Sequence, residues 1–73
     1  MTELEFDLEQ SPHIELYQLL KATGLCGSGG MAKHVIAAGE VTVDDTVETR
    51  KRGKIRLGQR VTFESTSIVI TKN

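Results

Sequence analysis

Positively charged side chains are concentrated in one short stretch of this 73-residue chain. Six of its nine lysines and arginines fall between residues 50 and 60: Arg50, Lys51, Arg52, Lys54, Arg56 and Arg60. No aspartate or glutamate lies between residues 49 and 63, so we expect these cations to have no local partners. Clustered lysines and arginines bind polyanions, because each phosphate that they neutralise releases condensed counterions. The stretch therefore predicts a phosphate-binding surface, although a charge run can also be only a solvated face.

The other residues with reactive or metal-binding side chains do not form a recognisable site. The two histidines, His13 and His34, and the single Cys26 lack the number and spacing of zinc ligands. The segment Gly24–Gly30 is rich in glycine, but it lacks the Gly-Lys-Ser/Thr sequence of a nucleotide-binding loop. No pair of carboxylates is placed for acid–base catalysis. We therefore expect a binding protein and not an enzyme, with no metal, no cofactor and no small-molecule substrate.

Length and charge distribution limit the protein further. A chain of 73 residues forms one small domain with a thin core. A single cysteine suits a reducing compartment, and neither a signal peptide nor an apolar run long enough to span a membrane is present. Residues 1–15 carry five acids and no cation, whereas residues 16–73 carry the other five acids and all nine cations. We expect a soluble cytoplasmic monomer whose net charge of −1 hides a strong dipole.

Two helices are predicted in the first half of the chain. Ser11 and Pro12 suit the start of a helix over residues 12–23, in which leucines 16, 19 and 20 form an apolar stripe. Ser28 suits the cap of a second helix that ends at Gly39, with Met31, Val35 and Ala38 on one line and Ala32 and Ile36 beside it. Because only a short loop joins them, the two helices should pack as a hairpin.

After Gly39 the spacing of apolar residues changes to the alternation that is typical of strands. A hairpin is predicted around Asp44-Asp45, because aspartate tolerates the left-handed conformations of a tight turn. Further strands are indicated by Ile55, Val61, Phe63, Ile68 and Ile70. We predict one α+β domain over residues 11–73, a two-helix hairpin packed on a small antiparallel sheet of three to five strands. Residues 1–10 form an acidic N-terminal arm or an edge strand.

The order of small and apolar residues between residues 16 and 63 resembles the S4-type RNA-binding domain, also called the alpha-L motif. The first part matches in its leucine-rich helix, in Gly24-Leu25, and in a second helix that begins at Ser28 and contains Ala32-Lys33. The second part matches in Gly39, Val41, Val43, Val47, Ile55, Gly58 and Val61. The chain also departs from the family's usual pattern: Glu15 and Gly29 stand where arginine is common, Asp44-Asp45 replaces Asn-Gly, and Gln59 replaces aspartate. The chain is most similar in outline to the small free-standing bacterial members of the family.

This resemblance implies that RNA is held by the second helix, the loop between the helices and the hairpin that follows. Lys33 matches the basic position of the family's second helix. We expect it to share one face with the basic run after the hairpin, which comprises Arg50, Lys51, Arg52, Lys54 and Arg56. Gly29 and Gly30 would let a phosphate approach the free N–H groups at the helix start, although they equally suit a tight turn.

The predicted function is therefore recognition of structured RNA, with ribosomal RNA as one candidate. Tyr17 and Phe63 are expected in the core, which leaves no exposed aromatic surface on which single-stranded bases could stack. Recognition of RNA shape and backbone suits the remaining residues better. The alternative is a protein-interaction module that docks an acidic partner through the edge of its sheet or through the cationic loop.

Overall fold

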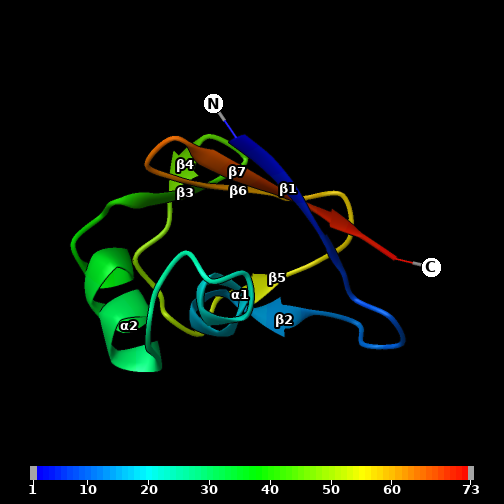
Figure 1. The fold of residues 1–73 in the computed structure, drawn as a ribbon, viewed down its shortest axis with the longest axis horizontal. Helices are drawn as coiled ribbons and strands as arrows, with labels where there is room; N and C mark the ends of the chain where they lie inside the picture. The colour runs from blue at the N-terminus through cyan, green and yellow to red at the C-terminus, as the bar shows by residue number, and fades with distance from the viewer. Residues whose placement is uncertain (1, 73) are drawn as a thin grey trace.

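A five-stranded sheet and two helices form the two layers of the domain (Figure 1). The computed structural model describes residues 2–72. The sheet contains β1 (Thr2–Asp7), β3 (Val41–Val43), β4 (Thr46–Val47), β6 (Arg60–Phe63) and β7 (Thr66–Thr71). The helices are α1 (Leu16–Ala22) and α2 (Gly29–Ala37), and a second, two-stranded sheet pairs β2 (Ile14–Glu15) with β5 (Lys54–Ile55) beside α1. The predicted α+β fold, with two helices packed on a small sheet, is confirmed.

The strand order of the main sheet is β1-β7-β6-β3-β4. Four of these strands pair antiparallel, as predicted, but β1 runs parallel to β7, with Thr2 opposite Thr66 and Asp7 opposite Thr71. The sheet is therefore mixed and not purely antiparallel. A parallel pair needs a long crossover connection, and here the helical layer and the other three strands supply it.

The core lies between the sheet and the helices. It is built mainly from aliphatic side chains, of which the largest that are fully buried are Leu16, Leu19, Leu20, Ile36, Ile55, Ile68 and Ile70. The predicted stripe of α1 is thus confirmed, but the stripe of α2 is displaced. Met31 is 48% exposed, and the buried positions of this helix are Ala32, Val35 and Ile36. Gly29 and Gly30 carry no side chain whose polarity could mark one face of the helix. The sequence therefore gives little indication of which face of α2 packs on the sheet.

The start of α1 differs from the prediction. The helix begins at Leu16 and not at residue 12, and Ser11 does not cap it. Residues 14 and 15 instead form β2, because β-branched Ile14 pairs with Ile55 in a short extended segment. The first N–H groups of the helix, those of Leu16 and Tyr17, donate to the carbonyl groups of Gly53 and Lys51 at 2.9 and 3.1 Å. A distant turn therefore satisfies the helix donors that a local cap was expected to satisfy.

Local signals at three other chain reversals are confirmed. The hydroxyl of Ser28 accepts a hydrogen bond from the N–H of Met31 at 3.1 Å and caps α2. Gly39 follows the helix with a φ of 78°, a left-handed conformation that suits glycine. Asp44 and Asp45 have φ angles of 51° and 68°, as the tight hairpin between β3 and β4 requires. The side chain of Asp44 also accepts a hydrogen bond from the N–H of Arg60 at 3.0 Å.

The hairpin turn yields a first prediction, because Asp44 and Asp45 both have positive φ angles but only the side chain of Asp44 accepts a hydrogen bond from Arg60. Asp45→Gly should raise the free energy of unfolding by about 0.5–1 kcal/mol, since glycine adopts positive φ without steric cost. Asp44→Gly gains the same relief but loses the hydrogen bond to Arg60, so it should be neutral or destabilising. Urea unfolding of both variants measures this difference. Equal stabilisation by the two variants would show that the Asp44 carboxylate contributes nothing.

The core yields a second prediction. Leu20 is fully buried in α1, so Leu20→Ala should lower the free energy of unfolding by about 2–5 kcal/mol through lost burial and the cavity left behind. The neighbouring Lys21 is exposed, and Lys21→Ala should change stability by less than about 0.5 kcal/mol. Thermal and urea unfolding followed by circular dichroism measure both values. A small effect at Leu20 would contradict the assignment of this stripe to the core.

Candidate nucleic-acid interface

The segment between β4 and β5, residues 48–53, carries the first half of the basic run across the start of α1. Its centre is a turn in which the N–H of Gly53 donates to the carbonyl of Arg50 at 3.1 Å. The carbonyl groups of Lys51 and Gly53 accept the hydrogen bonds from α1. The turn is thus fixed by its backbone, while the side chains of Arg50, Lys51 and Arg52 are exposed. Arg50, Arg52, Gly53 and Lys54 line a shallow depression of about 390 Å³.

Tyr17 is the residue at which the two predicted parts of the basic face meet. The ammonium group of Lys33 lies 4.9 Å from the centre of the Tyr17 ring, a cation–π contact between α2 and α1. The backbone N–H of the same Tyr17 donates to Lys51. A Cβ atom on Gly29 would lie 3.9 Å from the ring, so this glycine also borders Tyr17. Lys33 and Gly29 therefore border the side chain of Tyr17, and the backbone of Lys51 contacts the backbone of the same residue.

Three of the arginines have carboxylate partners, so the expectation that the run has none is wrong for them. Arg50 binds Glu48 with two side-chain hydrogen bonds of 3.0 Å, and its backbone N–H adds a third. Arg52 lies 3.8 Å from Glu15, and Arg60 pairs with Glu3 at 2.9 Å. These glutamates lie outside residues 49–63, and two of them are distant in sequence. Pairing of β2 with β5, and the position of β1 in the main sheet, bring those two close.

The remaining cations of the run are less restrained. Within residues 2–72, no carboxylate lies within ion-pairing distance of Lys51, Lys54 or Arg56. Lys54 lies on β5 and is exposed, whereas its neighbour Ile55 is buried. Arg56 begins the turn between β5 and β6, where its N–H donates to the side chain of Gln59 at 2.7 Å. Arg56 therefore belongs to a different turn from Arg50, Lys51 and Arg52.

Gly29 and Gly30 form the first turn of α2. Neither has a positive φ, and a Cβ atom at either position would meet only ordinary contacts, at 3.9 Å. The chain reversal after α1 instead uses Gly24, whose φ is 80°. The backbone conformation therefore does not require glycine at positions 29 and 30. The two glycines add no side chain of their own to the helix start, which Tyr17 and Ser28 border.

Sequence reasoning missed two features of this region. Tyr17 was expected simply in the core, but it is half-buried and connects α1 with α2 and the basic turn. Glu15 and Glu48 were not expected to bind the cluster. No local pattern marks these contacts, because each depends on which segments the fold brings together.

Cys26 has no features of a nucleophile. Burial, and to a smaller extent the charge of Glu64, raises the pKa of its thiol above the ordinary value of 9.0. The thiol is therefore protonated at neutral pH. Among the residues that the structure describes, no group of three or more histidine, cysteine, aspartate or glutamate side chains is placed to hold a metal ion. No helix within residues 2–72 has the length and apolar character needed to cross a membrane.

The Glu48–Arg50 pair yields a third prediction. The pKa of the Glu48 carboxyl lies below its ordinary value of 4.5, mainly because the Arg50 side chain and then its backbone N–H donate to the ionised form. A lowered folded-state pKa stabilises the fold above pH 4.5, and that contribution disappears as the pH falls through the lowered value. Arg50→Gln should move the pKa of Glu48 upward toward 4.5, as NMR titration of the carboxyl measures.

Arg52→Gln is the matched control, because Arg52 carries the same charge in the same turn and binds Glu15. It should leave the titration of Glu48 unchanged. If both variants shift the Glu48 pKa equally, the general positive charge of the turn and not the paired hydrogen bonds would be the cause.

Known proteins are similar to this chain in sequence and in fold. A model of the S4 domain family matches residues 6–71. The protein named "Putative RNA-binding protein YbcJ" from Escherichia coli strain K12 is 51% identical over 65 residues, which cover 89% of this chain and 93% of that protein. YbcJ of Shigella flexneri has the same identity and coverage.

A solved structure agrees with the sequence matches. The solution structure of E. coli YbcJ superimposes with a TM-score of 0.68 at 45% identity and covers 97% of this chain and 87% of its own. That structure is described as revealing an alpha-L motif involved in RNA binding. The resemblance predicted from the sequence is confirmed on both counts. The chain belongs to the S4 domain family.

Proposed function

We propose that this protein binds structured RNA, without catalysing a reaction, through a basic face formed by Lys33 and residues 50–56. The observation that carries the proposal is the meeting of two separate segments at Tyr17. Lys33 from α2 lies over its ring, and Lys51 from the turn accepts a hydrogen bond from its backbone. Membership of a family whose relatives are named for RNA binding supports the same conclusion.

The cations of this face should contribute unequally. Lys51 and Lys54 are exposed, and within residues 2–72 neither has a carboxylate to release before it meets a phosphate. The Arg52–Glu15 pair is long and its arginine is exposed, so exchange of Glu15 for a phosphate costs little. Arg50 must give up two charge-assisted hydrogen bonds to Glu48. We therefore place Lys51 and Lys54 at the centre of the interface, with Arg52 next and Arg50 last.

The start of α2 provides a second kind of phosphate contact. Gly29 and Gly30 are the first two residues of this nine-residue helix, where backbone N–H groups have no intrahelical acceptor. Ser28 uses one such group, that of Met31. A phosphate held between this helix start and Lys33 would gain from both the free donors and the helix dipole.

The aromatic residues favour folded RNA over single strands. Phe63 is buried, and Lys33 lies over one face of the half-buried Tyr17, so little aromatic surface is left on this face for base stacking. Phosphates and 2′-hydroxyl groups on a folded RNA surface match the lysines and N–H groups that remain. We propose a monomer acting in the bacterial cytoplasm, with ribosomal RNA as one candidate target.

A double substitution tests the proposal. Lys51→Gln with Lys54→Gln should weaken binding to a structured RNA hairpin. The negative slope of log Kobs against log salt concentration should become shallower by about 2, one for each lost phosphate contact. Lys21→Gln with Lys72→Gln is the matched control, since both lysines are exposed and removing them changes the net charge equally. Filter binding or fluorescence anisotropy between roughly 50 and 200 mM salt measures both slopes.

Two results would contradict the proposal. Equal losses in the two double variants would mean that only total charge matters, and a slope near zero in the unaltered protein would exclude a phosphate contact. Purification from lysate separates RNA binding from the alternative of docking an acidic protein. An RNA-binding protein carries nucleic acid that ribonuclease removes, whereas a docking module carries a stoichiometric polypeptide.

A further inference from the structure

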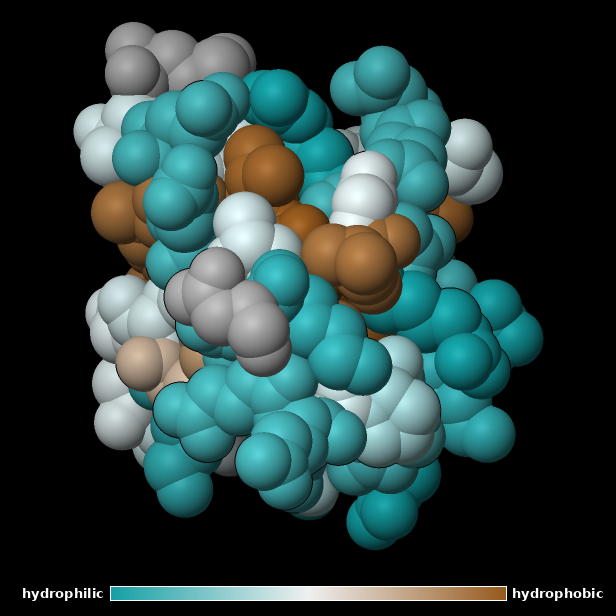
Figure 2. All heavy atoms as spheres, turned by 90° about the vertical axis from the view of Figure 1, so that its right-hand side faces the viewer, coloured by the Kyte–Doolittle hydropathy of each residue, from teal (hydrophilic) through white to brown (hydrophobic). Residues whose placement is uncertain are grey.

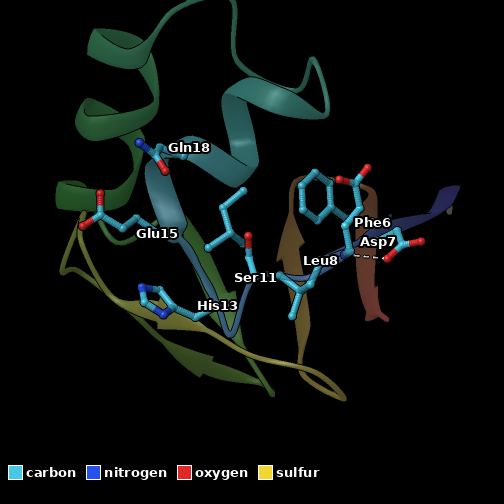
Figure 3. A pocket seen from close by; sticks show the side chains of 9 residues that line it. Phe6, Asp7, Leu8, Ser11, His13, Glu15 and Gln18 are labelled. Atoms are coloured by element: carbon cyan, nitrogen blue, oxygen red, sulfur yellow. Dashed lines mark hydrogen bonds between the residues drawn. The ribbon is translucent and has the colours of Figure 1, made fainter. Parts of the chain in front are cut away.

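A pocket of about 520 Å³ lies between the end of β1 and the start of α1. In Figure 3, Phe6, Asp7 and Leu8 line one side, and His13, Glu15 and Gln18 line the other. On the side of the molecule that holds the connection from β1 to β2, Figure 2 shows apolar side chains in the middle of a largely hydrophilic surface. The proposed RNA-binding residues do not line this pocket.

The floor of the pocket is apolar and fixed. Leu8 is 4% exposed and belongs to the core, and the half-buried Phe6 and Ile14 pack against that core. These three side chains cannot retract further without disturbing the packing between sheet and helices. The pocket therefore fits a small apolar group, such as one aliphatic side chain of a partner.

The walls of the pocket are acidic. Asp7, Glu9 and Glu15 line it, and no lysine or arginine does. Glu5, also on β1, is exposed nearby along the same strand. Arg52 approaches one member of this group, at 3.8 Å from Glu15. The negative charge of the walls repels phosphates and attracts lysine and arginine side chains. It therefore favours a positively charged partner and disfavours RNA.

The strand beside the pocket has an open edge. β1 is the outermost strand, and only β7 pairs with it in the described part of the chain. The N–H of Thr2 and the carbonyl of Phe6 point toward the β7 side, where they bond Ser65 and Thr71. Backbone groups alternate in direction along a parallel strand, so those of Glu3 and Glu5 face the open edge. An exposed edge of this kind accepts an additional strand from another chain.

We propose that the open edge of β1 and the adjoining pocket form a docking site for an extended, cationic peptide segment of a partner protein. The backbone of the segment pairs with Glu3 and Glu5, one apolar side chain enters the pocket over Phe6 and Ile14, and its lysines or arginines face Glu5 and Glu9. A segment in which apolar and basic residues alternate fits both the apolar pocket and the acidic side chains, since neighbouring side chains of a strand point to opposite faces. This surface adjoins the proposed RNA-binding face at Glu15, but none of the residues proposed to bind RNA lines the pocket.

A synthetic peptide of alternating lysine and leucine, added to the full chain, tests the proposal by NMR. Amide shifts should change along β1 and β2, with little change in α2 or residues 50–52. The peptide with glutamate in place of lysine should not bind. A peptide in which proline replaces the central leucines should bind at least about tenfold more weakly, because proline cannot donate to the strand edge.

Paired variants separate the site from general charge. Glu5→Gln with Glu9→Asn should weaken binding of the lysine–leucine peptide by roughly tenfold. Glu40→Gln with Glu64→Asn is the matched control and should bind as the unaltered protein does. The control removes two exposed acids that lie elsewhere on the surface. Each variant places asparagine at a position with positive φ, 59° at Glu9 and 55° at Glu64, a conformation that asparagine tolerates. RNA binding should be unchanged in both.

Three outcomes would overturn the proposal: shifts that map away from β1 and β2, equal losses in the two double variants, or equal binding of the anionic peptide. Concentration-dependent self-association that the peptide reverses would also overturn it, because the occupant would then be a second copy of this chain.

Discussion

Two backbone hydrogen bonds, from Leu16 and Tyr17 to the turn that holds Lys51 and Gly53, are the contacts on which the functional surface depends. They satisfy the first donors of α1, which lacks a side-chain cap. They also fix the basic turn against the helical layer, although its side chains are exposed. One interaction thus closes a helix end and positions charged residues that are more than thirty positions away in sequence.

The charges of the molecule are organised by the same fold. The acids of the N-terminal segment are not distant from the basic run, since Glu15 meets Arg52 and Glu3 meets Arg60. The pairs neutralise Arg52 and Arg60 and leave Lys51, Lys54 and Arg56 without carboxylates within residues 2–72. Acidic and basic surfaces therefore adjoin across β2, with Glu15 between them. Each can attract a partner that the other repels.

Features with a local physical cause could be predicted from the sequence. A serine before a helix, a glycine after one and a pair of aspartates between short strands act within a few residues, and Ser28, Gly39 and Asp44-Asp45 have the predicted roles. The start of α1 and the ion pairs could not be predicted, because Ser11 competes with carbonyl groups from residues 51 and 53 that no local window contains. The role of Tyr17 could not be predicted for the same reason, because it depends on the segments that surround this residue in the fold.

The parallel pairing of β1 with β7 has a consequence for how the protein is made. These two strands are 64 positions apart in sequence, since Thr2 lies opposite Thr66. During synthesis β1 leaves the ribosome before the helices and the other strands of the sheet, and β7 follows all of them. The parallel pair can close only after the whole intervening segment has been translated, and such long-range closure is slow. Until then the apolar side chains of β1 lack their final cover, so the nascent chain passes through a period in which this segment is open to chaperones or to other unfinished chains.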